Sequence, residues 1–469
     1  MEKGCHLRRL SEISRGSLAT DRRAVEAETV ALLQRLIQFN TTNPPGNELP
    51  LARYIEGILT AEGIETKFLI PAENRAAVVA RIRGNGNARP VMMLAHMDVV
   101  GVEADKWSCD PFGGVVRDGY LYGRGAIDDK GMLAANIMAM LLIQRTVIAA
   151  GRTLERDVVL VATSDEEAGG EVGIKWLVEN HRDLFDAEFA INEGGRTRIV
   201  AGGKRYLAIQ TAEKISHMVT LTARGPAGHA AIPLAGNAIF RLARALEWIS
   251  HYHEPVTLTE TTRRFFGDLS SVWSDAAERD AMAGLVSDDP DAQARGASAL
   301  SRIPVFNAVI RTGISPTSLS AGVRNNVIPA EASAVLNVRT IPGYAIEDVV
   351  SRLQEAVKDD GVEITITGHG AEAPASDPSS EMFRAIATCA KELDNEMAVV
   401  PYLSTGGTDS AQLRRIGINS YGILPFPMAQ EDEERMHGHD ERVPVASLHF
   451  GTRLIFESIR RIALAATAT

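Results

Sequence analysis

The sequence predicts an α/β protein in which a mostly parallel sheet carries helices on both faces and a smaller α+β domain is inserted into it. Strand-like apolar runs alternate with helical segments through the first part of the chain, which favours a parallel sheet covered on both sides. That alternation changes near residue 212 and returns near residue 372. The chain has 469 residues, too many for a single hydrophobic core, so two domains are expected.

The elements of the first part follow from periodicity and from breaking residues. Apolar residues at helical spacing predict a helix from Arg23 that ends at the proline-containing breaker at 40–45. Residues 1–22 before it are expected to form a flexible lead. Further helices are predicted at 49–61, 131–148 and 171–180, and strands at 65–70, 76–82, 91–94, 157–163 and 187–192.

The region 212–371 has a different order of elements. Its pattern reads β-α-β-β-α-β, which predicts a small domain built on an antiparallel sheet, and a charged, helix-prone insertion lies near 255–305. The predicted strands are at 217–223, 309–312, 332–338 and 362–367, and the helices at 237–250 and 346–357. Helices at 381–393 and 445–464 then continue the first part, so 23–211 and 372–469 are predicted to form one larger domain.

Composition and charge limit the classes of function. Hydrophobic residues make up 45% and charged residues 23% of the chain, as in ordinary globular proteins. The formal net charge of −11 argues against nucleic acid or an anionic membrane as the main partner. Three cysteines without paired spacing, no signal-peptide pattern and no apolar run of about 18 residues favour a soluble protein of the cytoplasm.

Metal-ligand residue types follow the apolar run that ends at Leu94. His96 and Asp98 come directly after it, at the strand end where open α/β sheets gather their chemistry. Imidazole is a good zinc ligand, and a carboxylate two residues away can accept the other ring N–H and orient the ring. The pattern predicts a metal ligand at His96 that Asp98 supports.

A glycine-rich loop between Gly123 and Gly131 contains the pair Asp128-Asp129. Two-metal hydrolysis needs a carboxylate that bridges two cations about 3.5–4 Å apart, with terminal His and carboxylate ligands on each. Glycines allow unusual backbone geometry beside a ligand, so Asp128 is the candidate bridge. The simpler alternative is a turn with solvated acids.

Further acidic residues and imidazoles complete this pattern. Glu166 and Glu167 are adjacent after a predicted strand, so one can bind metal while the other serves as general base and then general acid. Glu193 follows the next strand, and His437 and His439 offer a second imidazole. Such clusters in one chain predict a metallohydrolase; no P-loop or dinucleotide fingerprint is present to favour a nucleotide-binding enzyme.

These motifs, in this order, resemble those of the dinuclear zinc peptidase and amidohydrolase family that includes glutamate carboxypeptidase, aminoacylase, acetylornithine deacetylase, succinyl-diaminopimelate desuccinylase and Gly-Xaa carboxypeptidase. The resemblance covers nearly everything after residue 23. It implies two divalent metal ions per chain, zinc first, with cobalt or manganese as alternatives. The implied ligands are His96 and Glu193 on one ion, Glu167 and His437 on the other, and Asp128 between them. Glu166 is implied as the general acid/base and Asp98 as the support of a ligand.

The inserted region resembles the lid or dimerisation domain of this family, so a homodimer is expected. His229 matches a histidine that stabilises the oxyanion of the tetrahedral intermediate, often from the partner subunit. Arg339 and the loop residues Gly407 and Thr408 match positions that hold the substrate carboxylate, a task that suits the planar fork of arginine. Asn326 is a further candidate for substrate contact.

Two substrate classes stay open at this point. A small peptide, cleaved by a carboxypeptidase or dipeptidase, and an N-acyl amino acid, cleaved by an aminoacylase, both present an amide near a free carboxylate. Arg339 therefore serves either. The insertion near 255–305 departs from the compact lid of shorter members, and resembles the Gly-Xaa carboxypeptidase branch. An inactive binding protein of the same fold is disfavoured, because every candidate ligand and Glu166 are present.

Overall fold

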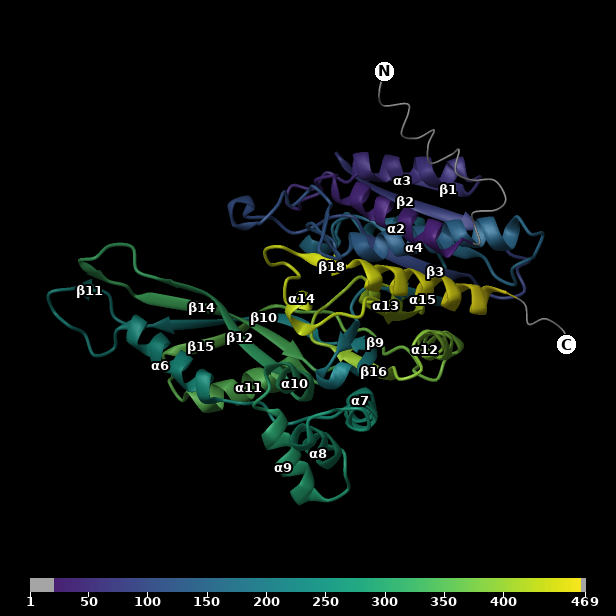
Figure 1. Ribbon diagram of the computed structural model, residues 1–469. Coiled ribbons are helices and arrows are strands. Elements are labelled where there is room, and N and C mark those ends of the chain that lie inside the picture. The colour runs from purple at the N-terminus through teal and green to yellow at the C-terminus, as the bar shows by residue number, and fades with distance from the viewer. Residues whose placement is uncertain (1–20, 465–469) are drawn as a thin grey trace.

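The computed structural model describes residues 21–464 of the chain. Its strands form two main sheets, one of nine strands and one of four, which lie side by side with the smaller sheet extending away from the larger one (Figure 1). The predicted flexible lead at 1–22 falls almost wholly outside the described residues. The first helix of the described residues, α2 (Arg22–Ile37), begins where the side chain of Asp21 caps it.

The large sheet has parallel strands at its centre. Its strands are β1 (Glu65–Ala72), β2 (Arg75–Ile82), β3 (Val91–His96), β6 (Val158–Thr163), β7 (Phe189–Asn192), β8 (Arg196–Ile199), β9 (Arg205–Glu213), β16 (Ala398–Ser404) and β17 (Asn419–Gly422). The order is β1-β2-β6-β3-β7-β17-β9-β16, with β8 beside β9. β6, β3, β7 and β17 run parallel, β1 and β2 form an antiparallel edge, and β16 runs parallel to β9.

Helices cover both faces of this sheet, as predicted. Alternate residues of β3 show the two faces: Met93 and Ala95 belong to one buried apolar cluster, and Met92 and Leu94 to another. The first cluster is covered by α2, α3 (Leu49–Ala61), α4 (Lys130–Ile143), α12 (Glu381–Leu393) and α15 (Val445–Ala463). The second is covered by α5 (Ile174–His181) and α13 (Ser410–Arg415).

The helix α4 is buried along its whole length and continues as a π-helical turn over Gln144–Ile148. In the described chain the stretch Lys130–Ile148 is long and apolar enough to cross a membrane, but 78% of its most apolar window is buried inside the protein. That burial is the property of a core helix.

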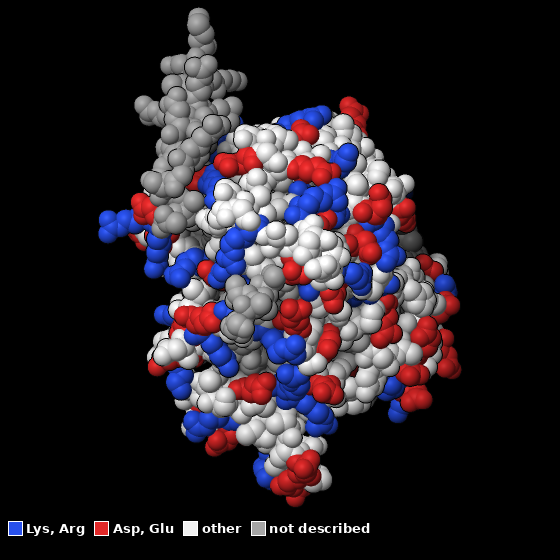
Figure 2. Space-filling model, turned by 90° about the vertical axis from the view of Figure 1, so that its right-hand side faces the viewer, with Lys and Arg blue, Asp and Glu red and all other residues white. Residues whose placement is uncertain are grey.

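On one face of the molecule, acidic and basic side chains are interspersed (Figure 2).

The small sheet confirms the predicted antiparallel α+β unit. Its order is β12-β14-β10-β15, all pairs are antiparallel, and a separate pair of short strands, β11 and β13, lies at its far end (Figure 1). The strands are β10 (Ile215–Arg224), β11 (Gly228–His229), β12 (Gly313–Ala321), β13 (Val327–Ile328), β14 (Glu331–Thr340) and β15 (Val362–Gly368). Two helices, α6 (Ala238–His251) and α11 (Ile346–Val357), bury their apolar faces on it.

The prediction of a strand at 309–312 is wrong. Those residues include the end of a helix, α10 (Pro304–Ile310), and the strand β12 begins only at Gly313. Proline at the first helical position has a backbone angle already suited to the helix, so Pro304 starts a helix that the β-branched residues alone did not indicate.

The helix-prone insertion is helical and packs on the edge of the large sheet. Its helices are α7 (Glu260–Ser270), α8 (Ala276–Leu285) and α9 (Pro290–Leu300), followed by α10. Phe265 packs against Tyr402 of β16 with ring centroids 5.5 Å apart and the rings tilted, and Phe266 contacts Phe306. These helices share one apolar cluster with β9 and β16, so they extend the core of the large sheet (Figure 1).

Candidate metal centre and substrate cleft

The two carboxylate oxygens of Asp128 face two different imidazoles. His96, the last residue of β3, places Nε2 2.9 Å from Asp128 Oδ1. His437 places Nε2 3.0 Å from Asp128 Oδ2 and 3.3 Å from Glu167 Oε1. Ligand atoms of His96, Asp128 and Glu167 all lie within 4.8 Å of one another. This is the arrangement in which one carboxylate can bridge two cations.

The electrostatics of the cluster fit metal binding. Burial, and then repulsion by Glu166 and Asp128, raises the pKa of Glu193 well above its usual value. Burial likewise raises the pKa of Glu166. Glu167 Oε1 is buried without a hydrogen-bond partner among the described residues. Such crowded, desolvated carboxylates are stable when cations lie among them, and two imidazoles with three carboxylates form a donor set that suits zinc.

The imidazole of His437 also responds to this acidic surrounding. Its hydrogen bond with Asp128 and its ion-pair contact with Glu167 raise its pKa to about 10. Burial alone would raise the pKa of Asp128, but the hydrogen bonds with His437 and His96 lower it. A divalent cation bound by His437, Asp128 and Glu167 would displace a proton from this ring.

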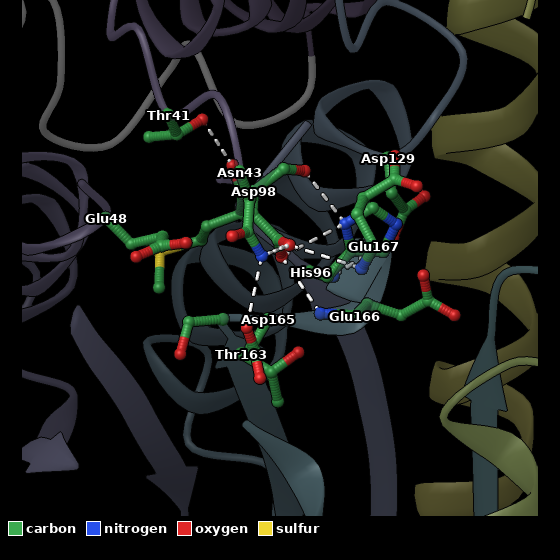
Figure 3. A network of polar contacts seen from close by, with 12 residues as sticks. Thr41, Asn43, Glu48, His96, Asp98, Asp129, Thr163, Asp165, Glu166 and Glu167 are labelled. Carbon is green, nitrogen blue, oxygen red and sulfur yellow. Dashed lines mark hydrogen bonds and ion pairs between the residues drawn. The ribbon is translucent and has the colours of Figure 1, made fainter. Parts of the chain in front are cut away.

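Asp98 holds the glutamate pair in place. Its Oδ1 accepts the backbone N–H of Glu166 and its Oδ2 that of Glu167, each at 3.2 Å. The side-chain amide of Asn43 donates to Asp98 Oδ2 at 2.9 Å and to Asp165 Oδ1 at 3.1 Å, so it lies between the two acids (Figure 3). The closest partner of His96 Nδ1 is the backbone carbonyl of Asp98, at 2.9 Å, whereas the carboxylate is 3.6 Å away.

Glu441 supports the loop that carries Asp128, a role that sequence reasoning missed. Its buried carboxylate accepts the backbone N–H groups of Gly125, Ile127 and Asp128 at 2.8–3.1 Å. Arg124 pairs with the same carboxylate at 2.6 Å. The only signal in the sequence was the closeness of Glu441 to the late His-Gly-His.

The neighbours of Asp128 and His437 take other positions. Asp129 Oδ2 accepts the backbone N–H of His96 at 3.2 Å, and burial raises the pKa of this carboxyl well above its usual value. His439 lies at the surface, where its Nε2 is 3.0 Å from Glu103. The structure thus brings Asp128 and His437 into the cluster and gives their neighbours different partners.

A cleft of about 350 Å³ opens beside Glu166 and contains most of the predicted substrate contacts. Glu166, Arg339, Gly407 and Thr408 all line it. Arg339 donates to the side-chain oxygen of Asn337 at 3.0 Å and to the carbonyl of Thr405 at 3.3 Å. Its side chain is therefore oriented from the small sheet toward the loop of the large domain.

His229 and Asn326 lie elsewhere. His229 belongs to β11, and Asn326 is the turn residue just before β13, at the far end of the small sheet and well away from β3 (Figure 1). His229 is exposed, and the carbonyl of Asn326 accepts the N–H of Ala230 at 3.1 Å. Within one chain these two residues are not brought to Glu166.

Comparison with known proteins agrees with this geometry. A model of the peptidase family M20/M25/M40 matches residues 92–461. The chain belongs to this family. Members are metal-dependent hydrolases of peptide or other amide bonds, and so is this chain.

The chain is 28% identical over 371 residues to N-fatty-acyl-amino acid synthase/hydrolase PM20D1 of Xenopus tropicalis, covering 76% of this chain and 69% of that protein. It is 28% identical over 367 residues to probable carboxypeptidase S-like 2 of Dictyostelium discoideum, covering 76% and 68%.

Solved structures share the fold over nearly the whole chain. The M20 family metallo-carboxypeptidase Sso-CP2 from Sulfolobus solfataricus superposes with a TM-score of 0.69 at 18% identity, covering 92% of this chain and 98% of that one. The dipeptidase Dug1p from Saccharomyces cerevisiae gives 0.68 at 15% identity, covering 95% and 98%. The YXEP protein of Bacillus subtilis, described as a dinuclear metal binding peptidase, gives 0.59 at 15% identity, covering 94% and 99%.

Proposed function

We propose that this protein is a two-zinc hydrolase that cleaves an amide bond next to a free carboxylate, acting as a carboxypeptidase or dipeptidase on small peptides. The observation that carries the proposal is the position of Glu166, which adjoins the Asp128 cluster and lines the same cleft as Arg339. A carboxylate whose pKa is raised by burial therefore stands between a metal-ligand set and a cation suited to the end of a peptide.

The chain's own residues supply the proton transfers and the orientation of the substrate. Two bound cations would lower the pKa of a water molecule and polarise the amide carbonyl. Glu166 takes a proton from the attacking water and returns it to the leaving amine. Asp98 fixes the backbone of Glu166, and Arg339 pairs with the substrate carboxylate so that the amide lies over the cluster.

We extend the proposal to a homodimer in which His229 and Asn326 of a second copy complete the cleft. Support comes from the surface around β11 and β13, where apolar side chains are exposed: Ile232 at 66%, Leu319 at 65% and Val323 at 89%. Large apolar side chains gathered at one end of a domain are typical of an interface. The cysteines among the described residues, Cys109 and Cys389, are both free, which suits the proposed cytoplasmic location.

The second candidate is hydrolysis of N-acyl amino acids. It is favoured by the relative named as a synthase/hydrolase of N-fatty-acyl amino acids, and Arg339 can hold the carboxylate of either substrate. The two candidates differ only in what lies on the acyl side of the amide.

The test is metal content together with hydrolysis of a panel: Gly-Xaa dipeptides, N-acetyl amino acids and long-chain N-acyl amino acids, with and without chelator. We expect about two metal ions per chain and cleavage that the chelator abolishes. Preference for dipeptides supports the first candidate, and preference for an acyl group supports the second. A purified, folded chain that binds no divalent metal would contradict both.

A further inference from the structure

Lys214 is a buried cation for which the described chain offers no acidic partner. It stands between β9 and β10, where the backbone passes from the large sheet to the small one, and it is 3% exposed. Its ammonium donates to the backbone carbonyl of Arg311, and no carboxylate of residues 21–464 lies within ion-pair distance. An ammonium has three N–H donors, so this contact leaves capacity for another acceptor.

Strand register places Lys214 beside Arg339. Ser216 pairs directly with Arg339, so Lys214, two residues earlier, is its diagonal neighbour on the same face. On the other side of Arg339 its partner is Gly313, and a Cβ there would lie 3.9 Å from the Lys214 ammonium. The lysine side chain therefore crosses the sheet next to Arg339.

Both cations line the cleft that contains Glu166. The described contacts of Arg339 are two neutral oxygens, and none is a carboxylate. Burial, and then the charge of Arg339, lowers the pKa of Lys214 to about 8, so it is still mostly protonated at pH 7. Lys214 is buried, Arg339 is half-buried and neither contacts a carboxylate of the described residues, so the two neighbouring charges are unfavourable unless an anion binds between them. One carboxylate matches the fork of Arg339, which leaves Lys214 for a second.

We infer that Lys214 and Arg339 form a subsite for an acidic amino acid, with Arg339 on its α-carboxylate and Lys214 on its side-chain carboxylate. This inference rests on the proposed function and narrows its substrate class to peptidyl or N-acyl derivatives of glutamate and aspartate. Lys214 is thereby a specificity-determining residue, because it pairs with a charge that lies away from the reacting amide.

The test compares N-acetyl-glutamate with the isosteric N-acetyl-glutamine, whose side chain is neutral, in the zinc-loaded full-length protein. The wild type is expected to favour the glutamate compound in kcat/KM. Lys214→Met keeps the length of the side chain and removes its charge, so it lowers kcat/KM for that compound about tenfold or more, through KM. The glutamine compound changes less than about twofold, and Lys214→Arg recovers part of the preference. Lys204→Met, at an exposed lysine beyond the other end of β9, changes neither value.

Several results overturn the inference. Equal loss for both substrates in Lys214→Met means that Lys214 acts only through its contact with Arg311. If the wild type cleaves the glutamine compound as efficiently as the glutamate compound, the inference is wrong while the proposed function stands. If no amide is cleaved, calorimetry that compares the binding of free glutamate with that of free glutamine tests the acidic subsite separately from the proposed function. Glutamate binding that is stronger than glutamine binding, and that depends on Lys214, then supports the subsite even though the proposed function has failed. Equal binding overturns both.

Discussion

The metal cluster and the far end of the small sheet are built in opposite ways. Around Asp128, ligands from several strand ends converge within hydrogen-bond distance, and Asp98 and Glu441 fix the backbone behind them. At β11 and β13, His229 and Asn326 are held by the backbone alone and face solvent. The comparison indicates that one chain gathers the expected metal ligands around Asp128, whereas two of the expected substrate contacts lie apart from them.

The largest expected effect is at the acid/base residue. Glu166→Gln keeps the shape of the side chain and removes its ability to carry the proton, so kcat falls about 10²–10⁴-fold. Bound metal, measured by mass spectrometry of the purified protein, stays at the wild-type level because Glu166 is not an expected ligand. Normal turnover in this variant would remove Glu166 from the acid/base role.

The next effect sharpens the contrast between two histidines two residues apart. His437→Ala removes a ring that contacts both Asp128 and Glu167, so one of the two expected metal ions is bound at least about 100-fold more weakly. This loss of metal affinity exceeds the loss typical for residues that only hydrogen-bond to a metal ligand. His439→Ala is the matched control, since His439 pairs with the surface residue Glu103. Loss of metal only in the His439 variant would reverse the assignment.

A third experiment asks whether the far end of the small sheet serves another chain. His229→Ala is expected to lower kcat about 10²–10³-fold with metal content unchanged. Mixed with Glu166→Gln, it regains activity if His229 acts across a dimer, because one site of the mixed dimer then has both native residues. Co-purification of differently tagged chains shows that the subunits have exchanged. If the mixture is still inactive, His229 acts within its own chain or has no catalytic role.

The smallest effect concerns the support behind the glutamate pair. Asn43→Ala removes two buried hydrogen bonds, to Asp98 and Asp165, and is expected to lower the free energy of unfolding by about 1–3 kcal/mol. Urea denaturation measures this loss. Asn40→Ala is the control, since the exposed Asn40 bonds only within its own turn. Equal stability of both variants would show that Asn43 is not needed to hold Asp98.

Much of the fold follows from local sequence signals. The helices Leu49–Ala61, Ile346–Val357 and Glu381–Leu393 were predicted to the residue, since each combines an amphipathic pattern with a clear start or stop. The predictions missed a three-stranded sheet of β4 (Val115–Arg117), β5 (Tyr120–Tyr122) and β18 (Arg442–Pro444). Strands of three residues are too short to show a period, and their pairing is set by contacts between distant segments.

The same division holds for the site. His96, Asp128 and Glu167 could be found from the sequence because they are metal-ligand residue types at strand ends or in a glycine-rich loop. Asn43 and Glu441 could not, because an amide in a turn and a carboxylate near the C-terminus acquire their roles only from tertiary contacts. Lys214 gave no signal either, since its burial and its closeness to Arg339 depend on strand register.

The hydrogen bonds from the Asp128 loop to Glu441 span 313–316 positions of sequence, and the contact from Asp128 to His437 spans 309. During synthesis on a ribosome, the segment with His96 and Asp128 therefore emerges long before the residues that complete its surroundings. The expected metal-ligand set and its support cannot be complete until synthesis has passed Glu441. A nascent chain that stalls before His437 exposes an incomplete ligand set, so metal loading depends on synthesis reaching this residue.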